Sequence, residues 1–521
     1  MGKPKKPETI DDLYGVITRW HLPVFLFAVI RGIPTTINVM AMVFVAPHQN
    51  YTCKTPPGWV AVEGQCSVTP LNGSDPKEIV PCMEWNYDHS VYAGTTIVEE
   101  WDLVCDRRWL ISTSQSVFLF GVMVGTILFS HIADWFGRKR SCLISLIWSS
   151  VTGVLMAFAP SIVWYNFFRF LTAVGSSGYS DSAHVLILES VAPNMRYFLT
   201  LTVGIGWSIG MLCVPLQAYL LPDWNLMHLV TPVPIFFLFM LWFCLDESAR
   251  WLMGAGRYAE AREVLVRLAK FRGDVPESRI DEMIEVIKKK DSECELMTKP
   301  TMADLFSKRY RKSSMIFCLL MMTSYTLWYH VTVSTAGVGA NPYISFAAAA
   351  FFELPGKAVN VLFIRFVRRR KATIFALVVA AAASFLWKRT PKRNSSADLA
   401  WLKLACLITC KMCTGAQGAV QRVQISEIYP SIVRAMSTGF FVTFGSFAGA
   451  FAPFFDDLAY LTYPWVPMAF IAVMCIVSCF AQLGLRETFE VVLTDGMHKE
   501  VQKKAPIIKQ GEINQTFKQG V

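Results

Sequence analysis

The sequence predicts an all-α membrane protein with twelve transmembrane helices arranged as two six-helix repeats. Of its 521 residues, 53% are hydrophobic and only 17% are charged, whereas a soluble globular chain carries about 25% charged residues. Long apolar runs recur along the chain, most of them near the roughly 20 residues that cross a bilayer as a helix. Several motifs of the first half also reappear in the same order in the second half, which indicates a duplicated unit.

The net charge of +10 does not indicate a nucleic-acid partner, because the cations cluster beside apolar runs and no basic-aromatic binding module is present. No phosphate-binding loop, HExxH metal motif or nucleophile elbow occurs, so neither an enzyme nor a cofactor or metal site is expected. The polar N-terminal tail, residues 1–20, has no signal peptide.

The first apolar run, residues 21–47, carries polar groups inside the predicted span. Arg31 has two equally weighted interpretations: it snorkels to the interface, or it faces the bundle interior. Asn38 lies two turns deeper and is a candidate substrate-binding residue that lines a polar path.

Residues 48–110 form a long polar segment with an acidic bias, nine acids against four bases, which favours the outer side of the membrane. An even number of cysteines in an oxidising compartment predicts two disulfides with three possible pairings. The cysteines are Cys53, Cys66, Cys82 and Cys105. Asn50 and Asn72 begin N-glycosylation sequons, and Asn72 is the stronger candidate because Asn50 lies close to the membrane edge.

The segment HIADWFGRKR, residues 131–140, is wedged between two apolar runs, 111–129 and 141–159. The link is too short to leave the membrane surface, so the two helices are expected to form a tight antiparallel hairpin on the cytoplasmic side. The plain alternative is a topology signal. The more specific interpretation is that an acid, a hinge glycine and a basic run hold neighbouring helix ends together. Those residues are Asp134, Gly137, Arg138 and Lys139.

The remaining spans before the centre of the chain are expected at residues 163–188, 198–221 and 229–245. A charged cytoplasmic loop, 246–312, follows and contains short amphipathic helices at 258–271 and 280–290. The second bundle, 313–486, is expected to hold spans at 314–335, 342–366, 372–387, 399–424, 435–456 and 465–485. The span at 372–387 is short and has basic clusters on both sides. Residues 487–521 are predicted to be a cytoplasmic tail.

The two halves repeat charged motifs at the same spacing. Glu189 precedes Arg196 by seven residues, and Glu427 precedes Arg434 by the same number. Asp-Glu-Ser at 246–248 corresponds to Arg-Glu-Thr at 486–488, and Gly-x-x-x-Gly pairs occur at 206–210 and 445–449. The second basic loop, RFVRRRK at 365–371, lacks both the acid and the glycine of the first.

Two such halves around a midplane cavity are how secondary transporters alternate access. The acids and bases at the cytoplasmic helix ends are therefore candidate gating residues that bridge to the basic hairpins. The alternative is a set of static surface ion pairs, each worth little. The candidates are Asp134, Gly137, Arg138, Lys139, Glu189, Arg196, Glu247, Arg250, Glu427 and Arg434.

Five segments together resemble the organic cation/organic anion/carnitine transporter family of the major facilitator superfamily. They are WDLVCDRRWL (101–110), HIADWFGRKR (131–140), DESARWLMGAGRYAEAREVL (246–265), FFELPGK (351–357) and SEIYPSIVR (426–434). The resemblance covers nearly the whole chain. It implies the major facilitator fold and polyspecific transport of small organic ions through an aromatic-lined cavity by alternating access.

The resemblance gives mixed signals about substrate charge. Glu353 suits the cation-handling branch, whereas Lys357 stands where the anion-handling branch tends to place a lysine. Ser446, nineteen residues past Glu427, fits neither the acid of cation carriers nor the arginine of anion carriers. Lys411 adds positive charge. We expect an anion or zwitterion, unless Glu353 and Lys357 neutralise each other as an i,i+4 pair.

Two other functions stay possible at this stage: a sugar or neutral-solute porter with the same fold, and a non-transporting receptor or scaffold. The degenerate second basic loop is the feature that supports the second. We expect an integral protein of the plasma membrane, with both termini cytoplasmic, whose partners are a small organic ion and the lipid bilayer. The sequence does not determine the oligomeric state, the coupling ion or the direction of transport.

Overall fold

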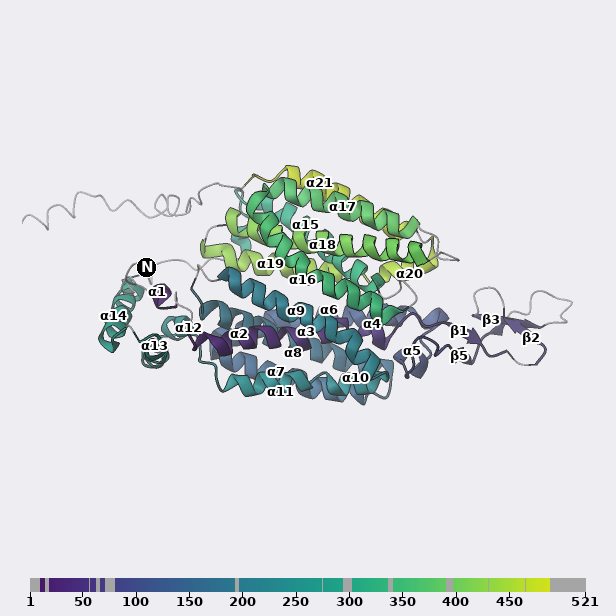
Figure 1. Ribbon diagram of the computed structural model, residues 1–521, viewed down its shortest axis with the longest axis horizontal. Helices are drawn as coiled ribbons and strands as arrows, with labels where there is room; N and C mark the ends of the chain where they lie inside the picture. Colours follow the sequence, from purple (N-terminus) through teal and green to yellow (C-terminus); the bar gives the residue numbers. More distant parts are fainter. Residues whose placement is uncertain are drawn as a thin grey trace, which may run out of the picture.

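The computed structural model describes residues 10–14, 18–55, 57–61, 66–70, 80–192, 196–273, 275–293, 302–335, 341–389, 397–429, 431–463 and 465–487. Its helices form two bundles that lie one above the other in Figure 1, the first half of the sequence below and the second half above. The all-α prediction is confirmed, since the only strands described are short ones in the polar segment after the first span.

The first bundle begins with one nearly continuous helical run in three pieces. These are α2 (His21–Ile30), α3 (Gly32–Met40) and α4 (Met42–Val45). The first break falls at Arg31 because Pro34 has no N–H to donate to the carbonyl of Ile30. The other helices of this bundle are α6 (Trp109–Phe136), α7 (Arg138–Ala157), α8 (Ile162–Glu189), α9 (Arg196–Leu220), α10 (Trp224–Val230) and α11 (Val233–Trp242).

Along the chain, a polar group of short helices lies between the two bundles. It contains α12 (Ala249–Gly254), α13 (Tyr258–Arg272), α14 (Glu277–Glu293) and the 3-10 turn η3 (Met302–Phe306). Near it lies α1 (Ile10–Tyr14), whose Leu13 and Tyr14 are buried in the same apolar cluster as α13. The second bundle contains α15 (Arg311–Thr335), α16 (Pro342–Phe366), α17 (Arg369–Arg389), α18 (Ala397–Ile428), α19 (Ser431–Gly449), α20 (Phe454–Leu461) and α21 (Val466–Leu483).

Each of the twelve predicted spans overlaps a helix or a run of helices, and three of the differences in their bounds have a clear cause in the sequence. The span expected at 435–456 ends at Gly449, because the ring of Pro453 excludes the helical carbonyl four residues before it. The span expected at 229–245 is split at Pro232. The short span at 372–387 is a full helix of 21 residues, α17, because its first and last turns are basic residues that the apolar run omits.

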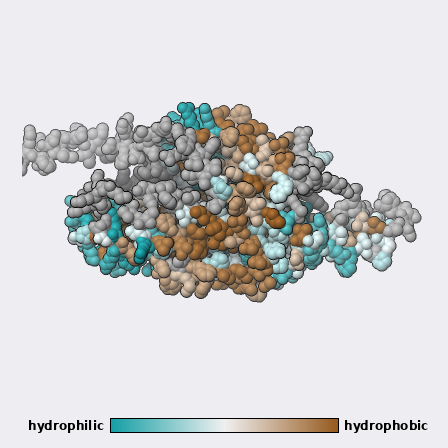
Figure 2. All heavy atoms as spheres, in the orientation of Figure 1, coloured by the Kyte–Doolittle hydropathy of each residue, from teal (hydrophilic) through white to brown (hydrophobic). Residues whose placement is uncertain are grey.

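Among the described residues, five helices or helical runs are long and apolar enough to cross a membrane. They are 21–45, 105–136, 138–157, 202–220 and 311–335. Figure 2 shows hydrophobic atoms gathered over the middle of the molecule and hydrophilic atoms at both ends, as a bilayer requires. Exposed aromatic side chains of α11 such as Phe236 and Phe237 belong to this apolar band.

The glycines of the repeated Gly-x-x-x-Gly motifs lie at close helix contacts in both bundles. A Cβ atom on Gly206 of α9 would overlap the carbonyl of Val29 on α2, and one on Gly210 would overlap Thr36 on α3. In the second bundle Gly445 of α19 lies against Tyr325 of α15 in the same manner. The two bundles therefore repeat this contact as well as the order of their helices.

The polar segment after the first span folds into two small antiparallel sheets. Strand β1 (Tyr51–Cys53) pairs with β5 (Trp85–Tyr87), and β2 (Trp59–Ala61), β3 (Ser67–Pro70) and β4 (Val80–Pro81) form the second sheet. The helices α5 (Ile97–Glu100) and η1 (Cys105–Arg107) then lead into α6. We call the end of the molecule that carries this segment the disulfide end, and the end that carries α12–α14 the hairpin end (Figure 1).

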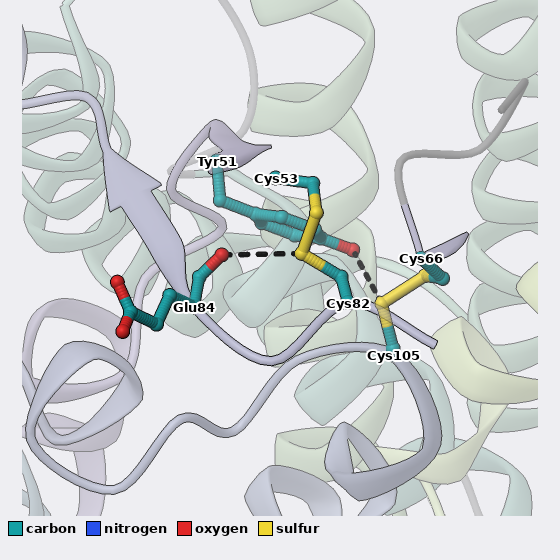
Figure 3. The surroundings of a disulfide bond; sticks show 6 residues. All are labelled: Tyr51, Cys53, Cys66, Cys82, Glu84 and Cys105. Atoms are coloured by element: carbon teal, nitrogen blue, oxygen red, sulfur yellow. Dashed lines mark hydrogen bonds between the residues drawn. A yellow bond between two sulfur atoms is a disulfide. The ribbon is translucent and has the colours of Figure 1, made fainter. Parts of the chain in front are cut away.

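The prediction that the four cysteines of this segment pair is confirmed, and the structure selects one of the three pairings. Cys53 is bonded to Cys82 and Cys66 to Cys105, so the two bridges interleave along the chain (Figure 3). The hydroxyl of Tyr51 lies 3.9 Å from the sulfur of Cys105, in the second bridge. Residues 71–79, which contain the predicted glycosylation site Asn72, lie outside the described residues, whereas Asn50 is described and exposed.

Loss of the Cys66–Cys105 bridge is expected to destabilise the polar segment. In the chain-entropy treatment a loop of this size contributes about 4 kcal/mol. Replacing both cysteines with serine should therefore raise protease cleavage within residues 48–104, measured on intact cells, and leave a linked Cys53–Cys82 peptide in a non-reducing digest. A digest of the unmodified protein that links Cys53 to Cys66 or to Cys105 contradicts this pairing.

Candidate functional site

At the hairpin end the turn between α6 and α7 consists of one residue, Gly137, with φ of 103°. Such a backbone conformation strongly favours glycine. A Cβ atom here would also collide with the carboxylate of Glu247 and approach the ring of Trp251. The reversal predicted for this segment is therefore as tight as a helical hairpin can be, and it brings the first turn of α7 against Glu247.

Glu247 closes the N-terminus of α7. Its Oε1 accepts hydrogen bonds from the backbone N–H groups of Arg138 and Lys139, each at 3.1 Å, and its Oε2 accepts a further one from Lys139 at 3.1 Å. Burial raises the pKa of this carboxyl group, while the N–H donors of Lys139, Ser248 and Arg138 act in the opposite direction. A carboxylate at this place satisfies unpaired helix donors and complements the positive end of the helix dipole.

The side chains of the same two basic residues complete a compact cluster. Arg138 contacts Asp134 at 3.0 Å and Glu189, at the end of α8, at 3.4 Å. Lys139 donates from Nζ to the carbonyl of Leu245 at 2.5 Å. We call the contacts of Glu247 and Glu189 with the first turn of α7 the first clasp.

The second bundle repeats this geometry although its loop has lost the acid and the glycine. Glu487 accepts from the backbone N–H groups of Arg369 at 3.0 Å and Arg370 at 3.3 Å, at the start of α17. The side chain of Arg369 contacts Glu427 of α18 at 3.1 Å, and Arg370 donates to the carbonyl of Leu483 at 2.8 Å. We call these contacts the second clasp.

The other predicted gating residues occupy varied positions. Asp134 is largely exposed, with 66% of its side chain accessible, whereas Glu189 and Glu427 are about one-fifth exposed. Arg250 lies 5.8 Å from the ring of Tyr14 and reaches the carbonyl of Val191 at 3.5 Å. The side chains of Arg196 and Arg434 lie outside the described residues.

At the disulfide end, in contrast, contacts join the two halves. Ser112 and Ser116 of α6 donate to the carbonyls of Pro453 and Ala450 at 3.3 and 2.5 Å. Arg108 lies 3.8 Å from Asp457 of α20.

Aromatic stacking adds to this interface. Phe44 of α4 packs on Tyr343 and Phe346 of α16, with ring centroids 5.2 and 5.5 Å apart. A cavity of about 350 Å³ remains beside these contacts, lined among others by Met40, Tyr92 and Gln115.

Between the two ends, Glu353 of α16 is paired with Lys411 of α18 at 3.2 Å, and both side chains are nearly buried. The ammonium group also lies 5.7 Å from the ring centre of Phe346. The structure thus joins two predicted substrate-binding residues, but to each other. The side chain of Lys357, the partner expected from sequence, lies outside the described residues.

A second charged group lies nearer the hairpin end, on the first bundle. Arg31 is 5% exposed and donates to the carbonyl and hydroxyl of Ser180 on α8 at 2.6 and 3.0 Å. Its other terminal nitrogen lies 3.3 Å from Nδ1 of His184. Within the part of the chain that the structure describes, its Nε has no hydrogen-bond partner. The interior interpretation of Arg31 therefore holds, and one of its donors is buried without a partner in this state.

Asp181 lies on α8, the helix of Ser180 and His184, within electrostatic range of Arg31, and was not singled out by sequence reasoning. Its carboxylate accepts a hydrogen bond from the hydroxyl of Thr126 on α6 at 2.8 Å. Across the interface between the halves, Tyr325 of α15 lies within electrostatic range of Asp181 and of Arg422 on α18. Arg422 is exposed and also lies within range of His184. The signal for Asp181 was present: an acid inside an otherwise apolar helix is a default functional candidate.

The two remaining predicted substrate-binding residues are packed close to this group. Asn38 of α3 is 4% exposed and hydrogen-bonds the hydroxyl of Tyr179 on α8. Ser446 of α19 is half-buried and hydrogen-bonds Tyr325. Arg169, a buried arginine that sequence reasoning also missed, serves packing, because it donates to the carbonyl of Ser114 and to Gln115 within the first bundle. No cluster of metal-ligating side chains occurs among the described residues.

Comparison with known proteins gives one family model and many relatives. The model described as "Sugar (and other) transporter" matches residues 28–495. Solute carrier family 22 member 6-B of Xenopus laevis is 28% identical over 452 residues, covering 85% of this chain and 79% of that protein. Organic cation transporter-like protein of Drosophila melanogaster is 29% identical, covering 80% and 75%. Organic anion transporter 3 of the rabbit, Oryctolagus cuniculus, is 26% identical, covering 90% of each.

Solved structures show the same fold. The inward-open xylose transporter XylE from E. coli aligns over 91% of this chain and 97% of its own, with a TM-score of 0.59 at 15% identity. XylE bound to 6-bromo-6-deoxy-D-glucose aligns over 91% and 98%, with a TM-score of 0.62 at 15% identity. These alignments confirm the predicted fold class. At this identity they support a conclusion about the fold only.

The clasps generate a stability prediction. Glu247→Ala leaves two N–H groups of α7 without their charged acceptor, a loss of about 2 kcal/mol or more. Glu487→Ala should cost a similar amount in the second bundle. Asp134→Asn, the matched control on an exposed acid, should change stability by less than about 1 kcal/mol. Thermal unfolding of the purified variants in detergent measures the difference. If Asp134→Asn and Glu247→Ala lower the unfolding temperature equally, the assignment of the clasp to Glu247 is contradicted.

Proposed function

The chain belongs to the sugar (and other) transporter family, and we propose that it carries small organic anions across the plasma membrane by alternating access. Its two halves move against each other as nearly rigid bodies, and the substrate binds between them. The hairpin end faces the cytoplasm, together with both termini, because the basic hairpins and the basic inter-half segment lie there. The disulfides face the oxidising exterior.

The observation that supports alternating access is the different distribution of contacts at the two ends. At the hairpin end each clasp ties a half to itself, whereas at the disulfide end Ser112 and Ser116 reach across to the other half. Such an arrangement corresponds to a state that is closed toward the outside. The gating set proposed from sequence, including Arg196 and Arg434, acts on this equilibrium by stabilising one state relative to the other.

The preference for anions rests on the charges between the halves. Glu353 and Lys411 neutralise each other. Arg31 and Arg422 belong to opposite halves and both lie within electrostatic range of His184, and the acid Asp181 lies within range of Arg31. The balance of the two arginines and Asp181 is one positive charge when Asp181 is ionised and two when it is protonated. The Nε of Arg31, which is buried without a partner among the described residues in this state, is the proposed donor to a carboxylate or sulfonate. Lys357 remains a proposed second partner for the same anion.

The curated relatives do not decide the charge of the substrate, because cation and anion transporters by name match this chain at similar identity. A neutral-solute porter is less consistent with the arginines that flank the interface. The hypothesis of a non-transporting scaffold rested on the degenerate second basic loop. The intact geometry of the second clasp removes that argument.

Transport selectivity tests the proposal. Uptake of benzenesulfonate, tetramethylammonium and xylose is measured in liposomes that contain the purified protein. We expect benzenesulfonate to be taken up, and Arg422→Ala to lower its kcat/KM by about tenfold or more, the worth of one charged hydrogen bond. Uptake of tetramethylammonium should not fall.

The matched control is Arg368→Ala, which removes the same charge from an exposed position in the second basic loop. It should leave the ratio of anion to cation uptake unchanged. Equal loss of anion and cation uptake in Arg422→Ala, at equal protein incorporation, contradicts an anion-binding role for Arg422.

A further inference from the structure

Asp181 is a membrane-embedded acid that the described contacts leave without a cationic hydrogen-bond partner. Among the described residues its carboxylate accepts a hydrogen bond from a neutral hydroxyl, that of Thr126, at 2.8 Å. Arg31, a cation within electrostatic range of Asp181, directs its terminal nitrogens to Ser180 and His184 instead. Among the described residues, therefore, no ion pair joins Asp181 to Arg31.

The titratable and charged groups around Asp181 come from five helices. On its own helix, α8, these are Tyr179 and His184; α6 contributes the neutral donor Thr126. Arg31 follows α2, Cys142 lies on α7 next to Arg31, Tyr325 belongs to α15 and Arg422 to α18. His184 accepts from Arg31 at Nδ1 and is therefore neutral in this state.

A carboxylate within a membrane-spanning helix is costly unless cations or several donors surround it. One hydroxyl is a small compensation, so the neutral acid suits Asp181 in this state. The side chain of Asp181 is half-buried, so part of it is accessible for exchange of a proton. Protonation has a further effect: it removes the negative charge that competes with an anionic ligand for Arg31.

We infer that Asp181 is a proton-binding site that couples proton movement to organic anion transport. This inference rests on the proposed function. On the entry side a proton from water forms an O–H bond with the Asp181 carboxylate, and the organic anion binds Arg31. On the exit side the anion leaves and Asp181 returns the proton to water. One proton and one monovalent anion cross together, so the cycle moves no net charge.

The test uses the purified full-length protein in liposomes, with benzenesulfonate as the probe because it stays charged and does not cross lipid as a neutral acid. With acid outside, the unmodified protein should accumulate the anion, up to about tenfold for each unit of pH gradient, since tenfold corresponds to 1.4 kcal/mol. A potassium–valinomycin potential should have no effect. Asp181→Asn should lose the response to pH and gain a response to an inside-positive potential.

Two further variants keep the outcome interpretable. Thr126→Val removes the donor to the carboxylate and should move the midpoint of the pH dependence of uptake to higher pH. Glu353→Gln, the matched control on an acid that already has Lys411 as its partner, should keep accumulation driven by the pH gradient at whatever rate remains.

Counterflow exchange of benzenesulfonate at equal pH separates the two claims. If counterflow is absent, the proposed function fails. If counterflow occurs but a pH gradient drives no accumulation, or if Asp181→Asn keeps the pH-driven accumulation, only the proton-coupling inference is overturned.

Discussion

The arrangement of the molecule depends on how charge is satisfied at the hairpin end. Glu247 and Glu487 each hold the first backbone N–H groups of a membrane helix, while Glu189 and Glu427 hold the arginine side chains beside them. Because these acids and bases pair within one half, each half behaves as a unit. The cohesion between the halves then comes from the disulfide end, where serine hydroxyls and stacked rings cross the interface.

The functional charges lie between these two units, where a relative motion of the halves changes their surroundings. Arg31 and Asp181 belong to one half and Arg422 to the other, so opening of either end alters the distance between them. A substrate that bridges the two arginines favours the state in which they approach. A proton on Asp181 favours the same state, since it removes a negative charge near Arg31 that repels an anionic substrate.

Much of the fold followed from sequence, because apolar run length, basic hairpins and repeated spacing are local signals. The break after Gly449 and the split at Pro232 were not predicted, since a proline within an apolar run does not by itself show whether the helix is interrupted there. The pairing of charged residues was harder to predict from sequence. Lys411 was expected to add free positive charge, and only the packing of α16 against α18 shows that Glu353 neutralises it. The second clasp was hidden because Glu487 lies 118 residues from the helix end that it holds.

The most direct test of alternating access between rigid halves is a pair of distance measurements by electron–electron double resonance. Spin labels at Trp109 and Leu461 report on the disulfide end, and labels at Trp135 and Lys371 report on the hairpin end; all four positions are exposed. The ten cysteines outside the disulfides are replaced beforehand. The account predicts two populations in which one distance lengthens as the other shortens, with benzenesulfonate shifting their ratio. Two distances that stay fixed, or that lengthen together, contradict it.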